Sequence, residues 1–173
     1  MKVFYDVLSN DELFSDSYKP VPIYDGCGYE IASALVVKGV GDIDIGRGNS
    51  FGGKDEEDAG VDDKAEKVNN LIDAFKYQET SFSKGDYTTY IKSYLKKIKE
   101  YLEGKNPTRV EGFMKSAKEM CGWILKNFDE FQFFMGESNE MENAMIILAY
   151  YKNPEDLAPH FIYFADGLRA QTF

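Results

Sequence analysis

The acidic residues between positions 55 and 66 are the side chains of this sequence best suited to a chemical role. Asp55, Gly60 and Glu66 stand at the first, sixth and last positions of a twelve-residue calcium loop. Carboxylate oxygens suit this hard cation, so the candidate ligands are Asp55, Glu56, Glu57, Asp58, Asp62 and Asp63. Glu57 and Ala59 break the pattern at the third and fifth positions, and no helices clearly flank it. A solvated acidic linker is the alternative, and calcium would bind weakly because the ion must order the loop.

Three lysines form a second candidate site. Lys92, Lys96 and Lys99 follow one another at steps of four and three, so they share one face of a predicted helix, opposite its apolar stripe. We call them the lysine ridge. A plain solvated face is the alternative, since lysines are mostly exposed. If the ridge is functional, it would contact acidic protein surfaces such as tubulin tails.

Catalytic patterns are not found. His160 is the only histidine, and no Gly-x-Ser-x-Gly elbow or Walker lysine pattern is present. Gly39 and Gly41 begin a Gly-x-Gly, but Asp44 occupies the position of a third glycine. Cys27 and Cys121 are too few and too far apart for a zinc site, and they are expected to be buried thiols in a reducing compartment. We therefore predict no enzyme activity, no zinc and no nucleotide cofactor.

Charge is distributed unevenly along the 173 residues. Residues 84 to 128 hold ten lysine or arginine residues against five acidic ones, while the whole chain has a net charge of −10. An acidic body makes specific nucleic-acid binding unexpected, and the basic segment suggests an acidic protein partner. Residues 1 to 7 lack a long hydrophobic run, which predicts neither a signal peptide nor a membrane span. The expectation is a cytoplasmic protein of one domain.

The lysine ridge belongs to a predicted helical hairpin at residues 84 to 128. Ser83 and Asp86 have the spacing of a capping box at its start, and Gly104 is the predicted end of the first helix. Asn106 is the expected cap of the second helix, with Pro107 at its first position. Apolar residues recur at steps of three and four in both halves: Tyr87, Tyr90, Ile91, Tyr94, Leu95, Ile98, Tyr101 and Leu102, then Val110, Phe113, Met114, Ala117, Cys121, Ile124, Leu125 and Phe128.

Short apolar runs separated by glycine and proline predict strands around this hairpin. The runs are 1 to 7, 29 to 37, 131 to 135, 144 to 151 and 161 to 164. Residues 64 to 78 fit a strand or a helix, and we favour a strand. Residues 10 to 12 are expected as a turn, with Leu13 and Phe14 packing its loop onto the body. Residues 38 to 68, with seven glycines and nine acidic residues, are predicted to form a mobile acidic loop. The fold class is therefore α+β, mainly antiparallel.

Five segments carry a resemblance to a known family. They are Asp11 to Asp16, Gln78 to Ser83, Tyr90 to Tyr94, Asn127 to Glu137 and Asp166 to Leu168. Together they resemble the translationally controlled tumour protein family, also called histamine-releasing factor, over nearly the whole chain. Residues 45 to 50 resemble its Gly-Asn-Ser signature more loosely. The opening Met-Lys-Val-Phe and the acidic loop resemble protozoan members.

The resemblance implies a β-tent with a projecting helical hairpin, similar to a zinc-containing Rab accessory protein whose zinc cysteines are missing here. It also implies binding of calcium, microtubules, small Ras-like GTPases and the translation elongation factor complex, without catalysis. Glu12 and Glu137 correspond to the acidic residues of the family's GTPase-facing surface. The leading hypothesis is a monomeric, cytoplasmic binding and regulatory protein that contacts no membrane. A protein that principally binds calcium at low affinity is the alternative.

Overall fold

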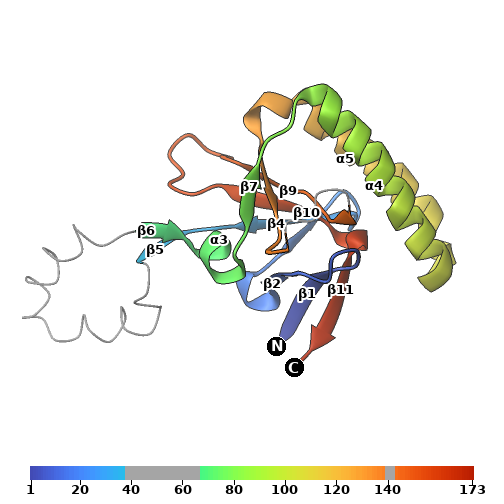
Figure 1. Cartoon of the computed structure of the whole chain (residues 1–173), viewed down its shortest axis with the longest axis horizontal. Coiled ribbons are helices and arrows are strands. Elements are labelled where there is room, and N and C mark those ends of the chain that lie inside the picture. Colours follow the sequence, from blue (N-terminus) through green and yellow to red (C-terminus); the bar gives the residue numbers. More distant parts are fainter. Residues whose placement is uncertain (38–66, 139–142) are drawn as a thin grey trace, which may run out of the picture.

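The computed structural model describes residues 1–37, 67–138 and 143–173. Most of the predicted acidic loop lies outside these residues, and so do all six candidate calcium ligands. Within the described residues, strand pairs are antiparallel throughout, and two long helices lie side by side at one flank of the sheets (Figure 1). The predicted α+β fold with mainly antiparallel sheets is confirmed.

The described strands form three sheets. The first has the order β11-β1-β2 and contains β1 (Lys2–Asp6), β2 (Glu12–Ser15) and β11 (Leu168–Thr172). The second has the order β3-β4-β10-β9-β8-β7 and contains β3 (Val21–Ile23), β4 (Gly28–Ala32), β7 (Gln78–Thr80), β8 (Gln132–Met135), β9 (Ile147–Tyr150) and β10 (His160–Phe164). The third pairs β5 (Leu35–Val37) with β6 (Lys67–Asn69).

Helices α4 (Lys84–Lys105) and α5 (Val110–Lys126) form the predicted hairpin. The Ser83 hydroxyl accepts a hydrogen bond from the Asp86 amide at 3.1 Å, as expected of a helix cap. The side chains that α4 buries come from the predicted stripe: Tyr87, Ile91, Tyr94, Ile98 and Leu102. Helix α5 buries Phe113, Ala117, Cys121 and Ile124 of its own stripe. The apolar spacing therefore identified most of the two packed faces. On α5, Met114 was predicted to pack but is exposed, and Met120 is fully buried although it was not predicted.

The predicted boundary between the two helices was wrong in detail. Helix α4 continues past Gly104 to Lys105, and a 3-10 turn, η2 (Pro107–Arg109), precedes α5. Asn106 does not cap a helix with its side chain; its Oδ1 accepts a hydrogen bond from the Thr108 hydroxyl at 2.8 Å instead. The α-helix begins only at Val110.

Four further expectations about the strands need correction. Residues 70–75 form helix α3 (Asn70–Phe75), because Asn69 Oδ1 accepts hydrogen bonds from the first-turn amides of Leu71 and Ile72. Leu13 and Phe14 belong to β2, not to a loop, and both are completely buried. The run at 29 to 37 is divided at residues 33 and 34, between β4 and β5. Strand β11 was not predicted at all.

The hairpin is attached to the sheets near η5 (Ala165–Gly167) and beside β9. Arg109 in η2 donates two hydrogen bonds to Asp166, from Nε at 2.9 Å and from a terminal nitrogen at 3.0 Å. Tyr90 of α4 donates its hydroxyl to the Ala144 carbonyl at 2.7 Å and accepts from the Ile146 amide at 2.9 Å. Each pair of hydrogen bonds fixes orientation as well as position. Because the two pairs involve η2 and α4, the hairpin is held at two separate places.

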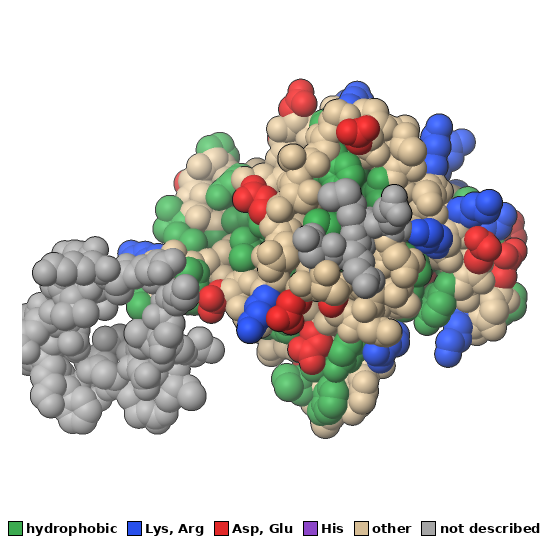
Figure 2. Space-filling view, viewed as in Figure 1, with side chains coloured by type: hydrophobic (Ala, Val, Ile, Leu, Met, Phe, Trp, Pro, Cys, Tyr) green, Lys and Arg blue, Asp and Glu red, His purple; other side chains and the backbone are tan. Residues whose placement is uncertain are grey.

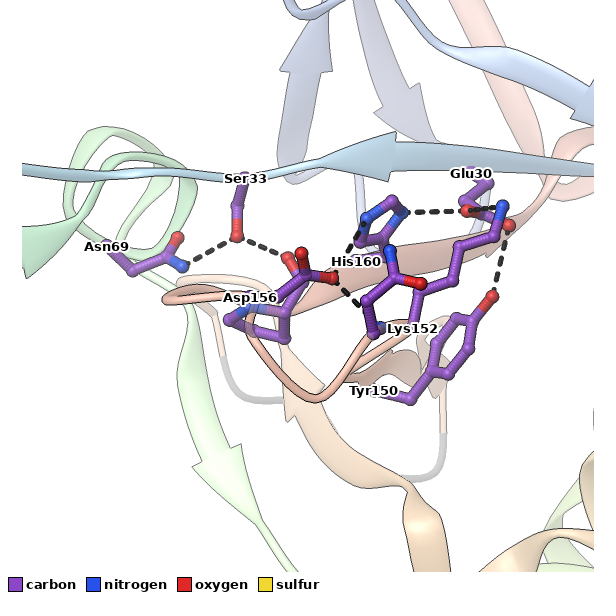
Figure 3. A network of polar contacts seen from close by, with 9 residues as sticks. Glu30, Ser33, Asn69, Tyr150, Lys152, Asp156 and His160 are labelled. Carbon is purple, nitrogen blue, oxygen red and sulfur yellow. Dashed lines mark hydrogen bonds and ion pairs between the residues drawn. The ribbon is translucent and has the colours of Figure 1, made fainter.

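A polar row crosses the face of β4, β9 and β10 (Figure 3). Glu30 contacts His160 Nδ1 at 2.7 Å, Lys152 Nζ at 3.2 Å and the Tyr150 hydroxyl at 3.3 Å. The other ring nitrogen of His160 lies 3.8 Å from Asp156. The only histidine of the chain is therefore engaged by neighbouring side chains.

Both cysteines are buried free thiols, as expected. Burial raises the pKa of each thiol to about 12, so neither is a reactive thiolate at neutral pH.

None of the helices within residues 1–37, 67–138 and 143–173 has the length and apolar character needed to cross a lipid bilayer.

Candidate functional site

The turn between β1 and β2 is built around the buried carboxylate of Asp6. Its side chain is 1% exposed, and it accepts hydrogen bonds from the Leu8 amide at 2.9 Å, the Ser9 hydroxyl at 2.9 Å and the Met145 amide at 2.7 Å. Burial raises the pKa of this carboxyl, although the three donors act in the opposite direction. The turn is thereby tied to the segment before β9.

Asp11 joins this turn to the segment after β8. Its carboxylate accepts hydrogen bonds from the Ser138 hydroxyl at 2.7 Å and the Ser138 amide at 3.3 Å. The Ser9 hydroxyl oxygen lies 3.1 Å from the same carboxylate, and Asp6 and Asp11 share its single proton. A Cβ atom at Gly136 would lie only 2.5 Å from Asp11 Oδ2, so the close approach requires glycine. Residues more than 120 positions apart in sequence thus form one surface.

Glu12 and Glu137, which the resemblance assigns to a GTPase-facing surface, flank this Asp11–Ser138 contact. Each is exposed and adjoins one of the two bonded residues in sequence. The Tyr5 hydroxyl donates to Glu12 Oε1 at 3.4 Å, and the Arg169 guanidinium lies 4.3 Å from the Tyr5 ring centroid. Desolvation and the Glu12 carboxylate together raise the pKa of Tyr5. Glu12 is the first residue of β2 and Glu137 lies in the segment after β8, and the Asp11–Ser138 contact joins these two places.

The lysine ridge lies on α4. In Figure 2, several blue Lys and Arg side chains, with a few acidic ones among them, lie on the right flank, where Figure 1 shows the hairpin. Lys92 and Lys96 are exposed, and Lys99 is half-buried. Within the described part of the chain, none of the three forms an ion pair. The ridge is a separate surface from that of Glu12 and Glu137.

The described residues contain no cluster of potential metal ligands. No group of three or more histidine, cysteine, aspartate or glutamate side chains there has an arrangement that could hold a metal ion. The six predicted calcium ligands, Asp55, Glu56, Glu57, Asp58, Asp62 and Asp63, lie outside the described ranges. Calcium binding by the acidic loop therefore stays a prediction.

Sequence reasoning missed the residues that assemble the surface around Glu12 and Glu137, which we call the glutamate surface. Asp11 was read only as part of a turn, and Asp6 only as part of a strand. The neighbouring motifs at Asp11 to Asp16 and at Phe133 to Glu137 indicated that both segments matter. Nothing in their spacing showed that Asp11 and Ser138 touch, because this contact depends on how the two sheets come together.

Comparison with known proteins identifies the chain. The family described as "Translationally controlled tumour protein" matches residues 1–169. The chain is 40% identical to translationally-controlled tumor protein homolog 1 of Dictyostelium discoideum and 39% identical to the homolog of Plasmodium chabaudi chabaudi, each over the full length of both chains. It is 41% identical to the Candida albicans homolog over 98% of both.

Solved structures agree with these relatives. The tumor-associated protein p23fyp of Schizosaccharomyces pombe superposes with a TM-score of 0.75 at 37% identity and full coverage of both chains. The Caenorhabditis elegans protein, at 22% identity, has a TM-score of 0.68 over all of this chain and 99% of its own, and it supports the fold alone. Taken together, the full-length sequence relatives and the shared fold show that this chain belongs to the translationally controlled tumour protein family.

Proposed function

We propose that this protein is a non-enzymatic cytoplasmic regulator that binds a small Ras-like GTPase through the surface of Glu12 and Glu137. The observation that supports the proposal is the Asp11–Ser138 contact, because Asp11 precedes Glu12 and Ser138 follows Glu137 in the sequence. Binding of the translation elongation factor complex is proposed from family membership alone.

The chemistry of the glutamate surface suits a nucleotide-exchange role. A GTPase holds its nucleotide phosphates with a P-loop lysine and a magnesium ion. An exposed carboxylate from a partner can compete for either cation. Carboxylate oxygens coordinate magnesium and accept hydrogen bonds from the lysine ammonium group. The proposed effect is faster release of bound nucleotide, with no bond made or broken by this protein.

Charge removal at the two glutamates should abolish that effect. In the variant Glu12→Gln with Glu137→Gln, the acceleration of labelled-GDP release from a Ras-like GTPase is expected to fall by about tenfold or more, as expected when charge-assisted contacts are lost. Release is followed by fluorescence with the protein in excess. The matched control is Glu103→Gln with Glu111→Gln, two exposed glutamates of the hairpin. Equal release rates with wild type, double variant and no added protein would contradict the proposal.

A second proposed function is microtubule binding through the lysine ridge, supported by the exposure of Lys92 and Lys96. Changing Lys92, Lys96 and Lys99 to glutamate should reduce co-pelleting with microtubules severalfold and weaken its salt dependence, because surface charge pairs are screened by salt. The matched control changes three exposed lysines of α5 in the same way: Lys115, Lys118 and Lys126. Equal losses in both triple variants would show that general basic charge, and not the ridge, binds the polymer.

The alternative function, low-affinity calcium binding by the acidic loop, is separated from these proposals by calorimetry. Heat of calcium binding that disappears when Asp55, Glu57 and Asp58 are changed to their amides would support it. Absence of heat at millimolar calcium would remove it and would leave the GTPase and microtubule proposals unaffected.

A further inference from the structure

A cleft of about 290 Å³ opens at the edge of the six-stranded sheet. One wall is formed by β7 and the extended residues that follow it as far as Phe82. The other wall is formed by η3 (Phe128–Glu130) and the start of β8. The cleft lies at the beginning of β8, whereas Glu137 follows the end of that strand, so it is distinct from the proposed GTPase-facing surface.

Aromatic rings form the base of the cleft and are fixed by one another. The Phe133 ring lies 5.5 Å from the Phe82 ring and 5.3 Å from the Phe128 ring, measured between centroids. The buried ring of Tyr87 packs against all three, at 5.3 to 6.1 Å. Aromatic pairs at these separations are mutually stabilising. The four rings therefore form one packed cluster at the base of the cleft.

The rim of the cleft is acidic. Glu79 of β7 and Asp129 of η3 both line it, and both are exposed. In the part of the chain that the structure describes, no lysine or arginine lines the cleft, and neither carboxylate forms an ion pair. Figure 2 shows acidic side chains beside hydrophobic surface on the upper part of this face. A cationic group is the complementary occupant, since it would meet carboxylates at the rim and ring faces below.

The neighbouring strand offers backbone groups to the same occupant. Strand β7 is the last strand of its sheet, and among the described residues it pairs only with β8. The edge of such a strand has amide and carbonyl groups that an extended peptide can join. A peptide laid along β7 would place alternate side chains toward the cleft.

We infer that this cleft binds an arginine side chain carried by an extended segment of a partner protein. Arginine fits better than lysine because its planar guanidinium stacks on aromatic faces and donates paired hydrogen bonds to carboxylates. The aromatic base supplies the stacking surface, Asp129 supplies the acceptor, and β7 supplies the main-chain contacts. Glu79 pairs with Phe134 and so projects from the opposite face of β7 to Phe133, where it adds negative charge at the rim. This is a protein-recognition site in addition to the proposed GTPase and microtubule surfaces.

The test uses the full-length, ¹⁵N-labelled protein titrated with the peptide acetyl-Thr-Arg-Thr-amide. Two probes accompany it: the same peptide with citrulline, which keeps the shape but removes the charge, and arginine amide, which lacks the flanking backbone. Saturable amide shifts are expected at residues 79 to 82 and 128 to 133 with the arginine peptide, with weaker binding of arginine amide. The citrulline peptide should bind about tenfold or more weakly, because the charge-assisted hydrogen bonds are lost.

The variant Glu79→Gln with Asp129→Asn should weaken binding of the arginine peptide by a similar factor. Both side chains are exposed, so the fold should persist, and the unliganded spectrum verifies it. The control Glu103→Gln with Glu111→Gln removes the same charge from the hairpin and should leave binding unchanged. Three outcomes would overturn the inference: no shifts at the cleft at millimolar peptide, equal binding of the citrulline peptide, or an equal loss in the hairpin control.

Discussion

Replacing Gly167 by alanine is expected to lower the free energy of unfolding by about 2–3 kcal/mol, the cost of forcing an extra carbon into a filled core. Gly167 ends η5 where the hairpin meets the sheets. A Cβ atom there would lie 2.0 Å from Tyr94 Oη and 3.1 Å from Met145 Cε. Both the glycine and the tyrosine are buried, so the clash cannot be relieved toward solvent. Urea denaturation of the wild type and the variant measures the difference.

The Tyr94→Phe background shows whether the hydroxyl causes this loss. Within the described residues, Tyr94 Oη has no hydrogen-bond partner although it is buried, so removing it should change stability by less than about 1 kcal/mol. With the hydroxyl gone, the nearest atom of that ring to the new methyl is Cζ at 3.3 Å. Gly167→Ala should therefore cost much less in the phenylalanine background. An equal cost in both backgrounds would contradict this account of the Gly167 position.

The hairpin was predictable because its determinants are local. The Ser83 cap and the three-four spacing of apolar residues lie within a few turns of one another, and the structure uses both. The start of the second helix was misjudged, because the 3-10 turn η2 comes between Asn106 and α5. Local signals thus gave the elements and their buried faces, but not every boundary.

Strands were predicted less well because their pairing is not local. Strand β11 (Leu168–Thr172) is mostly exposed and lacks a continuous apolar run, so its pattern is weak. It forms because β1, at the other end of the chain, provides a partner with matched register from Lys2 to Asp6. Leu13 and Phe14 were expected to pack but not to form a strand, for the same reason: the second partner of β1 is β2.

The candidate site shows the same limit. Glu12 and Glu137 were identified through family resemblance, since nothing about an isolated glutamate in an acidic chain distinguishes it. Asp11, Gly136 and Ser138, which hold their two loops together, were identified only by the structure. Their contact joins two sheets and depends on an approach that only glycine allows, which no spacing in the sequence encodes.

Removing the Asp6 carboxylate should be the most damaging change at the base of the glutamate surface. Asp6→Ala is expected to lower the free energy of unfolding by about 3 kcal/mol, because it leaves the Leu8 and Met145 amides without their acceptor. Asp6→Asn should cost less, since one amide oxygen still accepts. Urea denaturation measures both changes. Exposed Asp16→Ala is the control and should lie within about 0.5 kcal/mol of wild type.

The pH dependence of stability tests the ionisation of Asp6 itself. Because burial raises its pKa above the ordinary 3.8, the folded state binds more protons than the unfolded state in the window above that value. The stability that protonation of Asp6 contributes is fully present below pH 3.8, the ordinary pKa of the carboxyl. It is lost as the pH rises through the higher pKa that Asp6 has in the folded state. Asp6→Asn does not titrate, so the wild-type stability minus that of Asp6→Asn should decline as the pH rises from about 4. A difference that increases with pH would mean that the hydrogen bonds to the carboxylate outweigh its burial, contrary to the prediction.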